Sequence, residues 1–338
     1  MKKYVTPIIC SVLLLVSLLV NIPQKEDVFC GRGDGKDLKV TSVEQFVEVL
    51  DFFNGEEDVE SFASQDGISP YGATYNTGYS AVTPVNSATF YNKSKGKNSY
   101  KYDLNNYSNA TFDRELTVYL TYNSAYYKSV GKVMQNQSVS FNGKTAMASS
   151  IMDFDVEIYI MQQACCIKFN KFDMISSNSS VSEVEDVNNS ENYITSDMLG
   201  KWFNAGELGT AFLSINSENY ELLGSIGEYF ETNKLSHFKQ SKDVYTLKSE
   251  NYHNALAFIF GLGDMSEAED AYKIKGDFIF NLSNKVKPSI ILTMAFNDEE
   301  TTGYMENNMT FSNINNTIIE FKPEKVYNLR DYIKDGEI

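Results

Sequence analysis

Histidine, tryptophan and cysteine are scarce in this sequence of 338 residues, which contains two, one and four of them. Because histidine is scarce, the sequence does not favour a zinc site or a catalytic triad that uses imidazole. His237 and His253 stand far apart in the chain, which leaves a zinc site unsupported. No G-x-S-x-G, H-E-x-x-H, P-loop or dinucleotide-binding glycine motif occurs either. These absences predict a protein that is not an enzyme and has no cofactor or metal.

Basic charge is also lacking, because the formal net charge is −16 and the isoelectric point is near 4.6. No run of lysine and arginine is long enough to form a basic patch. Such a chain is repelled by nucleic-acid phosphates, so we expect no nucleic-acid partner. Hydrophobic residues make up 42% and aromatic residues 13%, which predicts a folded chain with a substantial core.

The N-terminus has the pattern of an export signal. Lys2 and Lys3 precede Ile8–Val20, an apolar run shorter than the ~20 residues of a spanning helix. We therefore expect residues 1–30 to be a signal peptide and the protein to be exported, either extracellular or in the cell envelope. A run counted from Tyr4 to Ile22 could just span a bilayer. A retained anchor that associates with the membrane is the alternative.

The stretch "DVFCGRGDGKD", Asp27 to Asp37, follows this run. Neither Cys10 nor Cys30 follows a small residue, so neither fits a lipid-attachment site. We expect cleavage after Cys30, with residues 31–37 as a glycine-rich spacer and Arg32-Gly33-Asp34 in a flexible tail. Asp34 and Asp37 lack the further ligands of a calcium loop.

The cysteines predict no disulfide framework. Adjacent Cα atoms lie ~3.8 Å apart, below the usual disulfide range, so Cys165 and Cys166 should remain thiols. In a strand they would point to opposite faces. The fold must then depend on its hydrophobic core rather than on disulfide bonds.

Helical periodicity first occurs in "TSVEQFVEVLDFFNG", Thr41 to Gly55. Ser42 and Gln45 have the spacing of a capping box, and the apolar residues recur on one stripe. Two further segments, 217–234 and 249–263, also have helical patterns. The stripe of the first helix, Val43, Phe46, Val47, Leu50 and Phe53, needs a partner surface to cover it.

Period-two alternation indicates strands with one buried and one wet face. It occurs in segments 114–122, 153–160, 273–283 and 287–298, and Asn142-Gly143 is a hairpin signal. Short connections between consecutive strands predict an antiparallel sheet. We expect one domain over residues 38–338, with the acidic, Ser- and Asn-rich segment 176–192 as a loop within it.

The closing segment "MTFSNINNTIIEFKP", Met309 to Pro323, is an alternating strand, an Asn-rich bulge and a β-branched strand that ends at proline. With the order helix, strands, helices, strands, it resembles the LolA-like superfamily, which includes bacterial lipoprotein carriers and the mycobacterial lipid-binding lipoproteins. The resemblance implies an α+β fold, in which helices cover the concave face of a curved antiparallel half-barrel sheet. It also implies a lipid-carrier activity as a possible function.

An incompletely covered apolar face can hold an acyl chain or another apolar ligand. We therefore predict a non-enzymatic binding protein with a lipid or apolar small molecule in a cavity between sheet and helices. The predicted lining residues are Phe46, Leu50, Leu116, Val118, Phe154, Val156, Ile158, Phe278, Phe280, Leu282, Ile290, Leu292 and Met294.

Two other functions remain open. One is an extracellular interaction or adhesion module that uses the Arg32–Asp34 tail or a tyrosine-rich sheet face around Tyr119, Tyr122, Tyr126 and Tyr127. The other is a hydrolase built on Asp153 and Asp155, which would project with Glu157 from one strand face.

Overall fold

The computed structural model describes residues 28–54, 85–101, 106–141, 144–161, 164–180, 194–205, 222–230, 232, 234–259, 275–297 and 301–332. Residues 1–27 of the signal peptide predicted over residues 1–30 lie outside these ranges, as does the predicted hairpin turn Asn142-Gly143. Among the residues that are described, no helix is long and apolar enough to cross a membrane.

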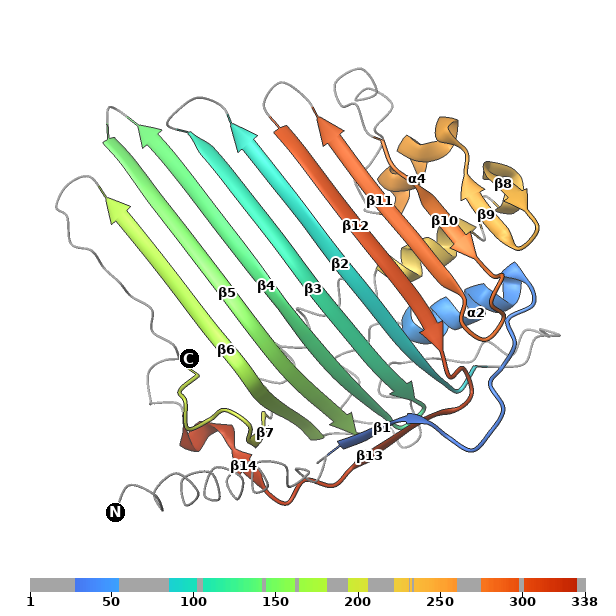
Figure 1. The fold of residues 1–338 in the computed structure, drawn as a ribbon, viewed down its shortest axis with the longest axis horizontal. Helices are drawn as coiled ribbons and strands as arrows, with labels where there is room; N and C mark the ends of the chain where they lie inside the picture. Colours follow the sequence, from blue (N-terminus) through green and yellow to red (C-terminus); the bar gives the residue numbers. More distant parts are fainter. Residues whose placement is uncertain are drawn as a thin grey trace, which may run out of the picture.

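A single sheet of 12 strands dominates the molecule, in the order β14-β7-β6-β5-β4-β3-β2-β12-β11-β10-β9-β8. All neighbours are antiparallel except β14 and β7, and Figure 1 shows the long central strands side by side. The strands are β2 (Ser87–Lys101), β3 (Tyr107–Thr121), β4 (Ser124–Phe141), β5 (Lys144–Met161), β6 (Ala164–Ser180), β7 (Trp202–Asn204), β8 (Phe238–Ser241), β9 (Val244–Leu247), β10 (Phe278–Asn281), β11 (Ser289–Asn297), β12 (Thr301–Ser312) and β14 (Val326–Asn328).

The helix predicted from Thr41 onward is confirmed as α2 (Val43–Asn54). Its N-terminus is capped, because Ser42 Oγ accepts from the Gln45 N–H at 3.2 Å and Gln45 Oε1 accepts from the Thr41 N–H at 2.9 Å. Phe46 and Phe53 pack edge-on or tilted against Phe311 of β12. The buried stripe of α2 therefore lies directly on the sheet.

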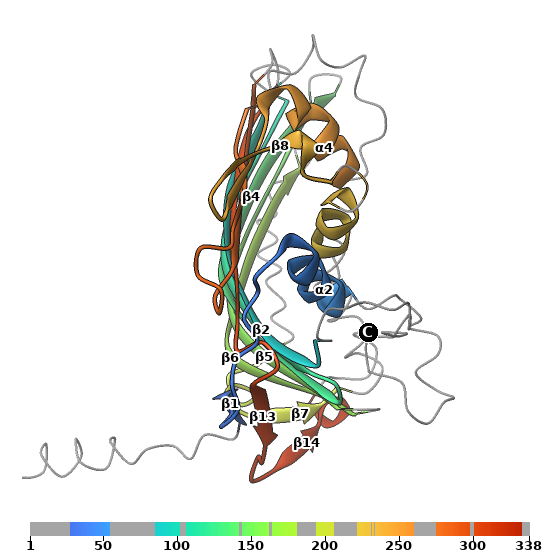
Figure 2. The same cartoon turned by 90° about the vertical axis from the view of Figure 1, so that its right-hand side faces the viewer.

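The predicted α+β class, with helices covering the concave face, is wrong. Strand is the main structure of the described chain, and the described helices are α2, α4 (Tyr252–Ile259) and residues 222–230. Figure 2 shows the sheet edge-on as a curved layer with α2 and α4 on its concave side. These short helices lie toward β2 and β8–β12, because apolar residues of the helices pack there, whereas β4–β6 extend well beyond them (Figure 1).

The strands are longer than their sequence patterns predict. Those from β2 to β6 have 15 to 18 residues each, although the second half of β2, "KSKGKNSYK", shows no apolar alternation. Its backbone is paired with β3 over its whole length and with β12 from Lys93 to Tyr100. Pairing to long neighbours therefore extends strands through sequence that has little strand propensity of its own. For the same reason Ser176–Ser180, predicted as part of a loop, belongs to β6.

A second, two-stranded ribbon crosses the convex face at the base of the sheet. It consists of β1 (Val28–Arg32) and β13 (Thr317–Phe321), which pair antiparallel from Val28–Phe321 to Arg32–Thr317. The chain leaves β12 for β13 through Asn313 and Asn315, which adopt φ of 51° and 60°. Asparagine tolerates this left-handed region better than most residues, which is why the predicted Asn-rich bulge forms the turn here.

Candidate functional site

The thirteen residues predicted to line a ligand cavity fall into two groups. Phe46, Leu50 and Leu116 belong to the larger group, whose ten members are at most 4% exposed and fill the core. The other seven of this group are Val118, Ile158, Phe278, Phe280, Leu282, Ile290 and Leu292. Only Phe154, Val156 and Met294 are partly exposed. The concave face is therefore solid core at its base and accessible further along the strands.

Cross-strand register shows how burial changes along the concave face. The row that contains Val118 and Tyr127 is buried in every strand: Phe311, Phe90, Val118, Tyr127, Ile158 and Ile167 are 0–4% exposed. Six residues along β2, a second row remains apolar but is only partly buried, and its last member, Met174, is exposed. This row, called the methionine-rich row below, consists of Met294, Met305, Gly96, Phe112, Val133, Met152 and Met174. It runs across seven neighbouring strands.

Two glycines let aromatic rings lie flat on this part of the sheet. A Cβ at Gly96 would be 2.4 Å from Phe112 Cε1, and a Cβ at Gly131 would be 3.0 Å from Phe154 Cζ. Each ring therefore covers the backbone of the glycine opposite it on the neighbouring strand. The rings broaden the apolar surface of the methionine-rich row and keep the glycine backbone from water.

A polar cluster lies between the buried row and the methionine-rich row, on the same face. Arg114 Nε donates to Ser129 Oγ at 2.9 Å, and Asn92 Nδ2 donates to Asn307 Oδ1 at 3.2 Å. Ser94 lies opposite Arg114 in the register and is 9% exposed. Asn92 Oδ1 is buried and accepts no hydrogen bond from the part of the chain that the structure describes. Such a buried acceptor is costly, so it marks this cluster as a place for a further polar group.

Most of this surface was not predicted from the sequence. Met152 could have been found, because it continues the period-two pattern of an apolar face by one step beyond the predicted residue Phe154. Met305 could not, because Asn307 interrupts the apolar alternation between Met305 and Met309. Phe112 and Arg114 were harder to place, since a charged side chain two positions before Leu116 is not expected on a core-facing side. Only its place in the period-two alternation, two residues before Leu116, indicated that Arg114 lies on the concave face; its charge did not.

The predicted tyrosine-rich face is not assembled. Tyr127 is 1% exposed in the core, whereas its neighbour Tyr126 lies on the convex face under the β1–β13 ribbon. Tyr119 packs beside Tyr126, with ring centroids 6.0 Å apart, and only Tyr122 is well exposed. Adjacent residues of a strand point to opposite faces, so these four side chains cannot form one patch.

The carboxylates predicted to share one strand face do share it, on the convex side, but each has a polar partner. Lys171 Nζ lies 2.7 Å from Asp153 Oδ2. Asn170 Nδ2 donates to Asp155 Oδ1 at 3.2 Å and to Glu157 Oε1 at 2.6 Å. Each carboxylate is thus engaged by an ion pair or by an amide donor, which is the arrangement of a structural row rather than of an acid and base pair. No group of three or more described His, Cys, Asp or Glu side chains could hold a metal ion.

The predicted thiols are confirmed for the described cysteines, which form no disulfide. Cys165 faces the concave core, and Cys166 packs in the convex cluster with Trp202. Burial is the main cause that raises the pKa of Cys30 to about 12 and that of Cys165 to about 12. These groups are uncharged and unreactive at neutral pH, so they do not serve as nucleophiles.

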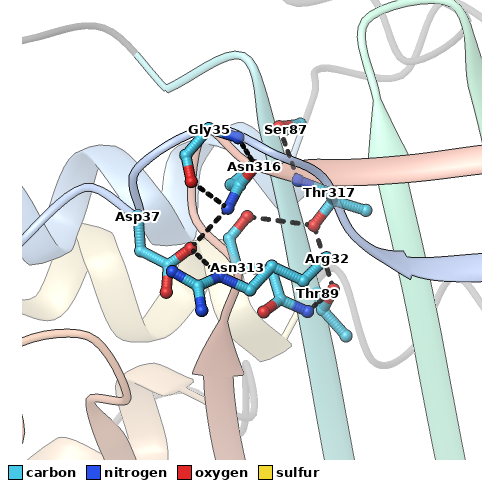
Figure 3. Close-up of polar contacts among 8 residues, drawn as sticks. All are labelled: Arg32, Gly35, Asp37, Ser87, Thr89, Asn313, Asn316 and Thr317. Carbon is cyan, nitrogen blue, oxygen red and sulfur yellow. Dashed lines mark hydrogen bonds and ion pairs between the residues drawn. The ribbon is translucent and has the colours of Figure 1, made fainter.

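The Arg32–Asp37 segment is held against the body of the protein and is not a free tail (Figure 3). Asn316 Nδ2 donates to Gly35 O at 2.9 Å and to Asp37 Oδ1 at 2.8 Å, and Asn316 Oδ1 accepts from the Gly35 N–H at 3.0 Å. Arg32 Nε donates to the same Asp37 oxygen at 3.1 Å. Gly33 is fixed by its N–H, which donates to Asn316 O at 2.7 Å.

Comparisons with known proteins add little to this geometry. No family model matches the sequence, and no curated protein matches it. Among solved structures, the translocator domain of the autotransporter NalP from Neisseria meningitidis matches 68% of this chain and 89% of its own length. That match has 5% identity and a TM-score of 0.20, so it supports no statement about fold or function. The resemblance to the LolA-like superfamily stays a prediction.

Proposed function

We propose that this protein is an exported, non-enzymatic binding protein that holds an acyl chain with an anionic head group on the concave face of its sheet. The methionine-rich row carries the proposal, because it is an apolar band across seven strands that the fold leaves partly exposed. Large apolar surfaces of this kind are uncommon in soluble monomers and usually serve binding. Export is proposed from the N-terminal segment alone.

The side chains of the row suit a flexible chain of variable shape. Met294, Met305, Met152 and Met174 are unbranched and adaptable, and methionine is used where one surface must fit several apolar partners. Each buried methylene contributes about 0.8 kcal/mol. Contact with five or six methylenes therefore supplies about 4–5 kcal/mol before the costs of binding.

The polar cluster defines the head group. Arg114 is a cation on this part of the concave face, and its Nε bond to Ser129 orients the guanidinium. A guanidinium binds carboxylate or phosphate through paired hydrogen bonds. Asn92 is a diagonal neighbour of Arg114 on the adjacent strand. Its Oδ1 would accept a hydrogen bond from a hydroxyl or amide N–H of the same head group. The ligand would lie with its chain along the methionine-rich row and its head at Arg114.

Native mass spectrometry of the protein purified from its own host tests this proposal. We expect a fraction of the protein to carry one extra mass of a few hundred daltons, which organic extraction removes and negative-ion analysis assigns to an acidic lipid. A protein that is free of such a mass, and that gains none after incubation with palmitate, contradicts the proposal.

A further inference from the structure

An open pocket, most of whose lining residues carry amide or hydroxyl groups, lies at the base of the sheet, away from the methionine-rich row. Its volume is about 550 Å³, and it lies between the Gly33–Gly35 loop, the start of β2, the β3–β4 turn and the Asn315–Ile318 segment. Residues from four separate parts of the chain therefore converge on it. A pocket of this size accommodates a ligand of one or two sugar rings.

The lining chemistry selects the kind of ligand. Amides and hydroxyls predominate, from residues such as Asn86, Asn123 and Thr121, and each of these groups can both donate and accept. Asp34 adds a carboxylate that only accepts. No lysine or arginine is present among the described lining residues, so an anion would find no counter-charge in a chain of net charge −16.

One aromatic ring completes the pocket. Tyr122, in the β3–β4 turn, is 39% exposed and belongs to the lining. An exposed aromatic face beside amides and hydroxyls is amphipathic in the same way as a sugar ring, which has apolar C–H faces and polar edges. Neither a wholly apolar ligand nor an anionic one matches this combination.

The inner wall of the pocket is rigid before any ligand arrives. Asn316 is fixed by its three side-chain bonds to Gly35 and Asp37 (Figure 3). A Cβ at Gly33 would approach Asn316 Oδ1 to 2.8 Å, so the loop backbone lies against that side chain without space between them. Asn315 is held as well, since its Oδ1 accepts from the Asn86 N–H at 2.7 Å. A preformed wall lowers the entropy cost of binding.

We propose that this pocket is a binding site for a neutral saccharide. The sugar ring would stack on Tyr122, while its hydroxyls would exchange hydrogen bonds with Asn86, Asn123 and Asp34. The pocket is separate from the concave face. One molecule could therefore bind an acyl chain on the methionine-rich row and a glycan in this pocket. An exported protein with both sites would attach a lipid-binding surface to a carbohydrate.

A glycan array that contains neutral, sialylated and sulfated oligosaccharides tests the proposal, with the wild-type protein and the Tyr122→Ala and Asn123→Ala variants. We expect the wild type to bind one or more neutral glycans and no acidic ones. Both variants should bind those glycans at least about tenfold more weakly, as the loss of one stacked ring and of one hydrogen-bonding side chain predicts. Tyr100→Ala is the matched control, because Tyr100 is a similarly exposed tyrosine (41%) at the other end of β2, and it should bind like the wild type.

Three results of the array without EDTA would overturn the proposal: no binding by a folded wild-type protein, equal binding by the wild type and Tyr122→Ala, or a preference for acidic glycans. Repeating the array with EDTA separates direct recognition from recognition through a cation. Binding that persists in EDTA supports the proposal as stated, whereas binding that is lost in EDTA contradicts it.

Discussion

Asn316 donates a hydrogen bond from Nδ2 to Asp37 Oδ1 over 2.8 Å. This bond connects the loop after β1 to the turn before β13. The same side chain makes two bonds to the Gly35 backbone. Each such bond contributes about 0.5–1.5 kcal/mol, and partners left unpaired add to the loss. Asn316→Ala should therefore lower the free energy of unfolding in urea by about 2–4 kcal/mol.

Asn308→Ala is the control for that prediction. Asn308 is also an asparagine, on β12, but its Nδ2 makes one side-chain bond, to Glu306 Oε1 at 2.7 Å. Its removal should cost at most about 1 kcal/mol. Equal losses in the two variants would show that the Asn316 network does not hold the N-terminal loop in place.

The close approach of β2 and Phe112 gives a second prediction. A Cβ at Gly96 would lie 2.4 Å from the Phe112 ring and 2.9 Å from the Tyr304 carbonyl oxygen. Gly96→Ala should destabilise the protein by about 1–3 kcal/mol, as overpacking does. Gly31→Ala is the control, since a Cβ there meets nothing nearer than 3.7 Å, and its effect in thermal unfolding should be small. A Gly96→Ala protein as stable as the wild type would contradict the ring placement.

Local signals account for the parts of the fold that could be predicted. The helix α2 needs only its own capping box and apolar stripe, both of which lie within fifteen residues of sequence. The length of β2 needs two partners, β3 and β12, and β12 follows more than 200 residues later. For this reason the sequence indicated a balance of helix and strand, and the strand content was underestimated.

Buried thiols predict a pH dependence of stability. The pKa of Cys30 and that of Cys165 are each raised by burial from 9.0 to about 12 in the folded protein. The unfolded chain ionises these thiols above about pH 9, whereas the folded chain keeps them protonated. Their contribution is therefore complete below pH 9 and is lost as the pH rises toward 12. Urea unfolding from pH 8 to 10.5 should show falling stability, and a flatter profile for Cys165→Ala. Identical slopes would contradict this.

The β1–β13 ribbon predicts where the mature chain begins. Val28 pairs with Phe321, and Cys30 with Ile319, so cleavage after Cys30 would remove most of β1. It would also uncover the convex cluster that contains Trp202 and Tyr159. Intact mass measurement of the exported protein should thus show a mature chain that retains Val28. A mature N-terminus at Gly31 would contradict a role for the ribbon in the exported form.

The candidate site was predictable one strand at a time. Alternation identifies Phe154, Val156 and Met294 as residues of an apolar face, as predicted. Their alignment into rows depends on the register between strands, which hairpin lengths and the bulge between Asp155 and Val156 determine. Which residues of a face end in the core and which remain exposed depends on where the helices lie, and that cannot be read from one strand.

Titration with the fluorescent fatty acid cis-parinaric acid tests the central claim most directly, because neighbouring residues of β5 provide a matched pair. Met152 lies on the concave face in the methionine-rich row, and Ile151 lies on the convex face with 37% exposure. We predict saturable binding by the wild type and by Ile151→Asp, and binding at least about tenfold weaker for Met152→Asp. Arg114→Gln should weaken binding of the acid but not of its methyl ester. No binding by the folded wild type, or equal losses in Ile151→Asp and Met152→Asp, would contradict the account.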